Sequence, residues 1–143
     1  MDVIVRGAAA GLTQEIYIGQ HRVRADEPIA AGGADQGPSP YELMLAALGA
    51  CTSITLQMYA RRKGWPLQGV TVGLRHTKVH ATDCANCDTQ GGKLDRIERI
   101  IEFAGPLTED QHARLLEIAD RCPLHRTLRA GVDIITHAAL KTN

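Results

Sequence analysis

The sequence predicts an α+β fold in which short strands accompany one long helix. Three observations indicate this class: alternating apolar and polar residues near the N-terminus, a long apolar segment opened by "SPYE", and two further alternating segments downstream. Alternation with a period of two is typical of half-buried strands, whereas a long apolar stretch behind capping residues favours a helix. At 143 residues the chain suits a single domain, residues 1–143, which can bury its core without disulfides or metal.

Composition and charge argue against several classes of function. Lys plus Arg equals Asp plus Glu, at 16 each, so no net charge favours a nucleic acid or an anionic membrane as partner. One Phe and one Trp provide no platform for stacked bases. "MDVIVRGAAAG" does not resemble a secretion signal, and no run elsewhere approaches the ~20 apolar residues of a membrane span. We therefore expect a cytoplasmic protein, whose four cysteines are reactive, metal-binding or buried rather than bridged.

The first part of the chain predicts three strands and a loop. The strands are expected at residues 2–6, 14–19 and 21–26. Ile16, Ile18 and Val23 alternate with polar neighbours, as a strand with one buried face requires. The next segment, "EPIAAGGADQGPSP", is rich in Gly and Pro and predicts a loop.

A long helix is predicted from Pro40 to a stop at Gly64. Ser39 suits the N-cap, Pro40 suits the first helical position, and Glu42 can reach back to complete a capping box. Residues spaced three or four apart should form one buried stripe. This stripe comprises Leu43, Ala47, Cys51 (or Ala50), Ile54 and Met58.

The second half of the chain predicts two paired strands, two helices and a last strand. The strands are expected at residues 70–80 and 94–103, on either side of a loop. Thr108 and Gln111 form a second capping box, which opens a helix over residues 109–121. Cys122 and Pro123 interrupt that helix, and a short helix should follow over residues 123–131. The final strand is expected at residues 132–140.

Two thiols are candidates for chemistry. Cys51 lies on the predicted buried stripe, where a cysteine is often only a small core residue. Cys122 is expected at a helix N-terminus beside Arg121, with His125 and Arg126 one turn further on. Free N–H groups and cations in this arrangement favour a thiolate. The same Arg and His side chains are also typical of a solvated helix face.

A second pair of thiols, Cys84 and Cys87, occurs in "CANC". One such pair supplies half of a tetrahedral zinc site, to which His80 or Asp83 could add a ligand. The alternative is a surface loop with two easily oxidised thiols. No GxSxG, Gly-rich phosphate loop or HExxH motif is present, so the thiols are the informative residues.

The segments "GADQGPSPYELMLAALGACTS" and "ADRCPLHRTL" resemble the family of OsmC and organic hydroperoxide resistance (Ohr) proteins. The resemblance covers nearly the whole chain. It implies an α+β swapped homodimer, with antiparallel sheets intertwined around long central helices and two sites at the interface. It also implies a peroxidase that reduces organic hydroperoxides, uses an external dithiol reductant and requires no cofactor. By this resemblance Cys51 is the peroxidatic thiol and Cys122 the resolving thiol.

The activating residues of Ohr enzymes are not all matched. Those enzymes pair an Arg from an early loop with a Glu just after the Pro that opens the central helix. Here Tyr41 occupies the position of that Glu, and Glu42 lies one residue later, which rotates a helical side chain by ~100°. The early loop "GAAAGL" has no Arg, which leaves Arg22, Arg24 or Arg126 as substitutes. We retain Glu42 and Arg126 as candidate site residues in what resembles an OsmC-like branch.

The leading hypothesis is a redox-active cysteine peroxidase of the oxidative stress response that acts through Cys51 and Cys122. The alternative is a non-enzymatic OsmC-like protein that senses redox state or binds an apolar ligand. Either form could carry zinc, with Cys84, Cys87 and His80 as ligands. Expected partners are a second copy of the chain, an organic hydroperoxide and a dithiol, with no nucleic acid and no membrane.

Overall fold

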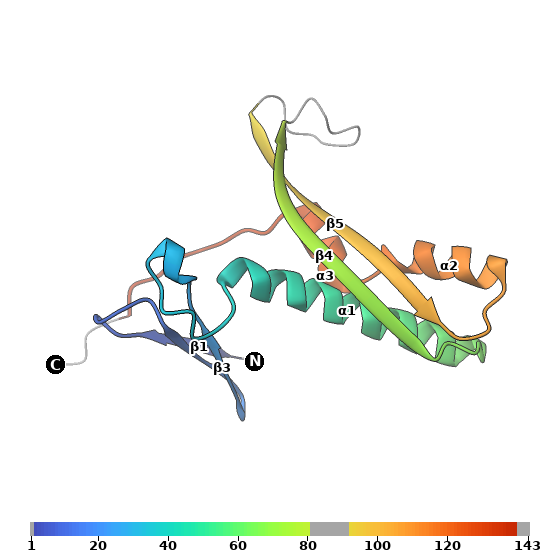
Figure 1. The fold of residues 1–143 in the computed structure, drawn as a ribbon, viewed down its shortest axis with the longest axis horizontal. Coiled ribbons are helices and arrows are strands. Elements are labelled where there is room, and N and C mark those ends of the chain that lie inside the picture. Colours follow the sequence, from blue (N-terminus) through green and yellow to red (C-terminus); the bar gives the residue numbers. More distant parts are fainter. Residues whose placement is uncertain (1, 81–91, 140–143) are drawn as a thin grey trace. The chain divides into compact units, whose positions relative to one another are not determined.

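The computed structural model describes residues 2–80 and 92–139 and confirms the α+β class (Figure 1). The elements are β1 (Val3–Gly7), β2 (Gln14–Ile18), β3 (His21–Ala25), η1 (Ile29–Ala31), α1 (Pro40–Lys63), β4 (Gly69–His80), β5 (Lys93–Ala104), α2 (Glu109–Ala119) and α3 (Pro123–Ala130). They form two compact units, each built from two stretches of chain. The first unit is Met1–Ala50 with Thr71–Glu102, and the second is Cys51–Val70 with Phe103–Asn143. The single domain expected over residues 1–143 stays a prediction.

The first unit contains an antiparallel sheet of β1, β2 and β3. Val5 lies opposite Ile16, which lies opposite Val23, so these three apolar residues form one row across the sheet. Because side chains alternate along a strand, Val3 shares this face with Val5. Val3 is 57% exposed and Val5 is 54% exposed, whereas Ile16 and Val23 are half-buried, so this apolar face is uncovered along β1.

Asp26 organises the loop that joins β3 to α1. Its buried carboxylate accepts hydrogen bonds from the Thr13 hydroxyl at 2.8 Å and from the N–H of Glu27 at 2.8 Å. It also accepts the N–H groups of Ala34 at 3.3 Å and Gln36 at 3.2 Å. Burial raises the pKa of Asp26, but the four donors outweigh burial and hold that pKa below its ordinary value.

The same loop contains one turn of 3-10 helix, Ile29–Ala31, where the sequence predicted only irregular structure. A short turn of this kind is common in connecting segments and has no sequence period of its own. Gly33 follows it, and a Cβ at this position would lie 1.8 Å from the carbonyl oxygen of Glu27. The loop therefore requires glycine there.

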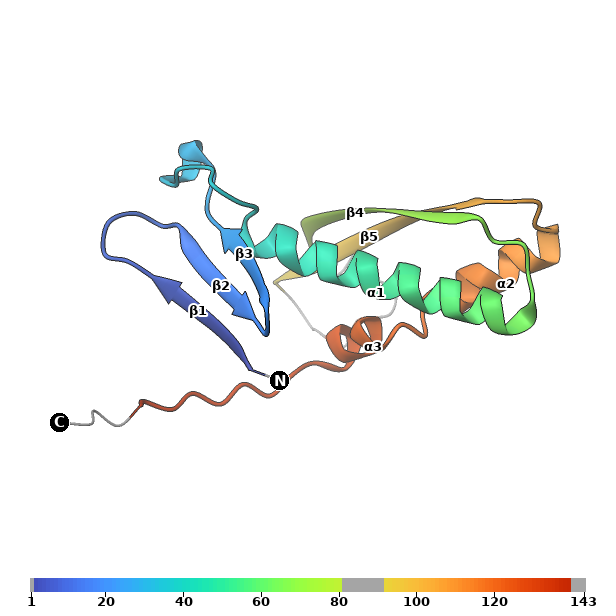
Figure 2. The ribbon, with the colours of Figure 1, turned by 90° about the horizontal axis from the view of Figure 1, so that it is seen from below.

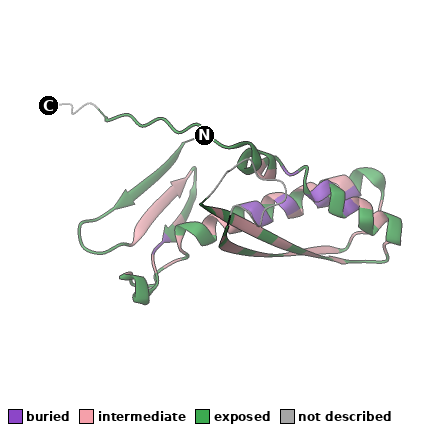
Figure 3. Cartoon of the chain, turned by 90° about the horizontal axis from the view of Figure 1, so that it is seen from above, coloured by how far each residue is buried: buried purple, intermediate pink, exposed green. Residues whose placement is uncertain are grey.

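Helix α1 begins at Pro40, as predicted, and the capping box is present. The Ser39 N–H donates to Glu42 Oε2 at 2.7 Å, and the Glu42 N–H donates to Ser39 Oγ at 3.3 Å. The predicted buried stripe is wrong, because Ala47, Ile54 and Met58 are exposed. The buried residues of α1 are Leu48, Gly49, Thr52, Leu56 and Ala60 (Figure 3). The helix itself carries apolar residues on every side, so their spacing in the sequence could not identify the buried face.

The length and composition of α1 also meet the requirements of a membrane span, contrary to the expectation that no run comes close. The mean hydropathy of its apolar window is 1.4, and 22% of that window is buried. A helix at the core of a soluble protein meets the same requirements.

Strands β4 and β5 pair with each other in a second sheet. Arg75 forms an ion pair with Glu98, and His76 Nε2 lies 2.8 Å from Asp95 Oδ1. The two strands are antiparallel, because the contacts of β4 residues 75 and 76 move backwards along β5, from residue 98 to residue 95. Gly49 of α1 packs on this sheet, and a Cβ there would lie 2.8 Å from the Leu74 side chain.

The second unit contains the end of α1 together with α2 and α3 (Figure 2). The predicted capping box at the start of α2 is confirmed, with Thr108 and Gln111 bonded reciprocally. Cys122 is the N-cap of α3, whose first residue is Pro123. The side chains buried in this unit are Thr52, Leu56, Ala60, Leu115, Ile118, Ala119 and Cys122.

The final strand predicted at residues 132–140 is not formed. Residues 131–139 have no regular structure, and Val132, Ile134 and Ile135 are 62%, 82% and 71% exposed. A strand needs a neighbouring strand to pair its backbone N–H and C=O groups. Within residues 2–80 and 92–139 no strand pairs with this segment. Its apolar pattern therefore lacks the partner that would make it a strand.

We predict that Asp26→Asn destabilises the protein at neutral pH. The carboxylate has a lowered folded-state pKa, so its contribution is present above its ordinary pKa of 3.8 and is lost as pH falls through the lower, folded value. Thermal unfolding followed by circular dichroism should show a melting temperature several degrees below wild type at pH 7, and a smaller difference at pH 3. Asp35→Asn, at an exposed position of the same loop, is the control. Equal melting temperatures for D26N and wild type at pH 7 would contradict a stabilising role of the Asp26 carboxylate in this loop.

Candidate active site

Two thiols that are far apart in the sequence, Cys51 and Cys122, meet in the second unit. Their side chains are hydrogen-bonded to each other, and both cysteines are free rather than disulfide-bonded. Cys51, on α1, is half-buried, whereas Cys122 is 0% exposed. Cys51 therefore keeps part of its surface open to solvent, whereas Cys122 does not.

Local structure fixes Cys122 at the start of α3. The Arg126 N–H donates to the Cys122 carbonyl oxygen at 3.1 Å, which closes the first turn. Pro123 has no N–H, so the N–H groups of Leu124 and His125 are the first donors of the helix. The sulfur does not cap the helix by a well-formed hydrogen bond, but both N–H groups act on it electrostatically.

The surroundings of Cys51 disfavour its thiolate. Burial raises the pKa of the Cys51 thiol, and the hydrogen bond with Cys122 raises it further. The Leu124 N–H and the Thr55 hydroxyl lower it by less, so that the pKa is raised overall. The Thr55 hydroxyl also donates to the Cys51 carbonyl oxygen at 2.8 Å. Cys51 is thus the thiol that keeps its proton.

The surroundings of Cys122 have the opposite effect. Burial by itself would raise the pKa of this thiol. Hydrogen bonding from Cys51, the N–H groups of His125 and Leu124, and the Thr52 side chain outweigh burial and lower the pKa. Thr52 is 0% exposed, and sequence reasoning did not select it. The available signal was a hydroxyl beside Cys51 in "ACTS" on an otherwise apolar helix.

The two other candidate site residues, Glu42 and Arg126, are both exposed. Glu42 is exposed and takes part in the cap of α1 through Ser39. Arg126 is an exposed residue of α3, one turn after Cys122. The catalytic roles of both residues stay predictions.

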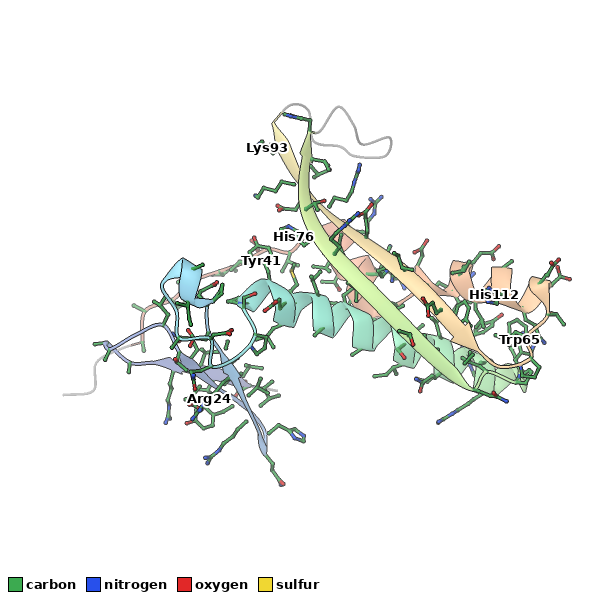
Figure 4. All side chains as sticks on the ribbon, viewed as in Figure 1. Arg24, Tyr41, Trp65, His76, Lys93 and His112 are labelled. Atoms are coloured by element: carbon green, nitrogen blue, oxygen red, sulfur yellow. The ribbon has the colours of Figure 1, made fainter. Side chains whose placement is uncertain are left out.

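The other substitutes for the Ohr pattern have partners within the first unit. Arg24 Nε lies 2.7 Å from Glu15 Oε1, and the Arg22 guanidinium lies 5.4 Å from the centre of the Tyr17 ring. Tyr41, which occupies the position of the Ohr glutamate, stacks on His76 with ring centres 4.7 Å apart (Figure 4). Tyr41 is therefore a packing partner of β4.

The predicted zinc ligands Cys84 and Cys87 lie outside the described residues. His80 is the exposed last residue of β4. In the described part of the chain no group of three or more His, Cys, Asp or Glu side chains could hold a metal ion. A zinc ion at the "CANC" loop stays a prediction.

Comparison with known proteins identifies the family. The family model of the OsmC-like proteins matches residues 32–137, which is more than half of the chain and includes both thiols. The chain therefore belongs to the OsmC-like protein family. Comparison with curated proteins gives no match.

Solved structures have the same fold. An OsmC-like protein from Mycoplasma pneumoniae matches at 21% identity and a TM-score of 0.67, covering 89% of this chain and 85% of that one. An organic hydroperoxide resistance protein OsmC from Legionella pneumophila matches at 20% identity and a TM-score of 0.64, covering 92% of this chain and 90% of that one. An organic hydroperoxide resistance protein from Elizabethkingia anophelis matches at 20% identity and a TM-score of 0.63, covering 87% of this chain and 84% of that one. At these identities the likeness concerns the fold alone.

Proposed function

We propose that this protein is a thiol-dependent peroxidase that reduces organic hydroperoxides through Cys51 and Cys122. The observation that carries the proposal is the contact of two reduced thiols, one reachable from solvent and one buried at a helix N-terminus. Membership of the OsmC-like family supports it. So do the names of similar structures, which are organic hydroperoxide resistance proteins.

The proposed reaction transfers one oxygen atom to sulfur and then forms a disulfide. The Cys51 thiolate attacks the distal oxygen of the hydroperoxide, the O–O bond breaks, and the alkoxide leaves and is protonated to an alcohol. The Cys51 sulfenic acid then condenses with Cys122, which releases water. An external dithiol reduces the Cys51–Cys122 disulfide and restores both thiols.

The environment of Cys51 on α1 favours organic peroxides over hydrogen peroxide. Ile54, 56% exposed, and Met58, 60% exposed, follow Cys51 on the same helix. Exposed apolar side chains on the helix of the reacting sulfur gain free energy when they bury the carbon chain of a substrate. Hydrogen peroxide has no carbon chain and gains nothing from them.

A second copy of the chain is the partner that these apolar surfaces require. In one chain α1 is mostly uncovered, the β1 part of one sheet face is exposed, and no strand of the described residues lies beside residues 131–139. Exposed apolar area on this scale is typical of an interface. A swapped homodimer covers all three surfaces, because each copy supplies a central helix and a chain end to the other.

We predict that the purified, reduced protein consumes cumene hydroperoxide in the presence of a dithiol. Cys51→Ser should abolish turnover, because a hydroxyl is not nucleophilic at neutral pH. Ser53→Ala is the matched control on the same helix and should retain the wild-type rate. The rate is measured as loss of hydroperoxide over time.

The peroxidase function fails if wild type consumes hydroperoxide no faster than the Cys51→Ser variant. Stoichiometric oxidation of Cys51 without turnover under any dithiol would favour the alternative function, a redox sensor. These two outcomes are separated by measuring hydroperoxide loss and Cys51 oxidation in the same sample.

We also predict a homodimer in solution. Sedimentation equilibrium should give twice the 15.5 kDa mass of the chain. Replacing Ile134 and Ile135 by Glu should weaken the dimer, because charged side chains are costly in an apolar interface. Asp133→Ser, in the same segment, is the control and should remain dimeric. A wild-type mass of one chain at micromolar concentration would contradict the swapped arrangement.

A further inference from the structure

Polar groups with hydrogens converge on the Cys122 sulfur from two helices, and those of the α3 first turn act on it electrostatically. Cys51 and the fully buried Thr52 come from α1, and the N–H groups of Leu124 and His125 come from the first turn of α3. A buried sulfur that faces donors is in surroundings suited to a negatively charged acceptor. Cys122 can therefore hold a negative charge at a position that solvent does not reach.

The groups around Cys51 do not provide the same support. Burial and the neighbouring Cys122 sulfur outweigh the Leu124 N–H and the Thr55 hydroxyl, which also donates to the Cys51 carbonyl oxygen. The glutamate that accompanies an arginine in Ohr enzymes is replaced at its position by Tyr41, which stacks on His76. Cys51 must nevertheless lose a proton before it can attack a peroxide, because the thiol form is a poor nucleophile.

Accessibility separates the roles of the two sulfurs. A hydroperoxide can approach Cys51, which is half-buried, but not Cys122, which is 0% exposed. The proton of Cys51 has only to cross the hydrogen bond between the two sulfurs. A buried sulfur that cannot meet the substrate can thus still serve the first step of the reaction.

We infer that Cys122 is the general base that takes the proton of Cys51 before it acts as the resolving thiol. This inference rests on the proposed peroxidase function and adds the source of Cys51 activation. It also makes Thr52 a positioning residue, which holds Cys122 ready to accept the proton.

The proposed reaction steps conserve protons and electrons. The proton passes from Cys51 to the Cys122 thiolate, and the Cys51 thiolate attacks the distal oxygen of the hydroperoxide. The S–O bond forms, the O–O bond breaks, and the leaving alkoxide takes the proton from Cys122 to become an alcohol. The restored Cys122 thiolate attacks the sulfur of the Cys51 sulfenic acid, and hydroxide leaves as the disulfide forms. Each sulfur loses one electron, the peroxide gains two, and an external dithiol supplies two for the next cycle.

Other titratable groups lie near the pair and belong in the design of a pH experiment. Asp120 and Arg121 precede Cys122, and His125 and Arg126 follow it. His125 Nδ1 lies 3.8 Å from Asp120 Oδ1. All four groups are retained in variants of Cys122 and Thr52, so differences between pH profiles report the thiol pair.

The deciding experiment compares the first oxidation step in wild type and Cys122→Ser. Oxidation of Cys51 is measured in a single turnover with cumene hydroperoxide, as the sum of dimedone-trapped sulfenic acid and Cys51–Cys122 disulfide determined by mass spectrometry. If Cys122 is the base, Cys51 of the serine variant should be oxidised at least about 100-fold more slowly at pH 7. An equal rate, with loss of the disulfide alone, would overturn the inference and leave Cys122 as a resolving thiol only.

A second variant keeps both thiols and covers the case in which Cys122→Ser does not fold. Thr52→Val has nearly the same shape but removes a donor to Cys122, so the pH at which Cys51 becomes half-maximally reactive toward iodoacetamide should rise. Ser53→Ala should leave that pH unchanged. An unchanged profile in Thr52→Val would count against the inference. Because alkylation needs no peroxide, its outcome is independent of the peroxidase assay.

Discussion

The hydrogen bond between the thiols of Cys51 and Cys122 is the interaction on which the proposed peroxidase chemistry depends. It joins a helix that carries the accessible sulfur to the first turn of a helix that stabilises charge on the buried one. Because a single proton is shared between unequal surroundings, the two sulfurs have opposite tendencies to ionise. In the proposed peroxidase that difference gives each thiol a separate task, although the side chains are chemically identical.

A second constraint is that α1 is apolar on every side. An amphipathic helix would be satisfied by one packed face, but this helix has buried residues such as Leu48 and Leu56 and exposed ones such as Ile54 and Met58. Burying the exposed residues gives a second copy of the chain a large hydrophobic gain on association. In the proposed dimer the same association would enclose the approach to Cys51, so assembly and substrate preference would have one physical origin.

Local signals in the sequence predicted local structure well. The capping residues Ser39, Glu42, Thr108 and Gln111 act over three positions, and both helices that they open begin where predicted. Pro123 likewise marked the start of α3 and placed Cys122 at its N-cap. The contact of Cys122 with Cys51 came from a family resemblance, since nothing in the spacing of two distant cysteines specifies that their sulfurs meet.

The failed predictions depend on interactions that are not local. Periodicity could not select the buried face of α1 when every face is apolar, so Ala47 and Met58 were misplaced. The strand expected at residues 132–140 needs a partner strand, which an alternating pattern does not supply. Thr52 was missed because a threonine on an apolar helix is ordinary until the sulfur that it faces is known.

Mass spectrometry of peptides after one equivalent of cumene hydroperoxide tests the central claim most directly, because it maps which cysteines have joined. The pairing of a reachable thiol with a buried one predicts a Cys51–Cys122 disulfide as the main product. A Cys84–Cys87 disulfide with Cys51 and Cys122 still reduced would contradict the account and move the chemistry to the loop between β4 and β5.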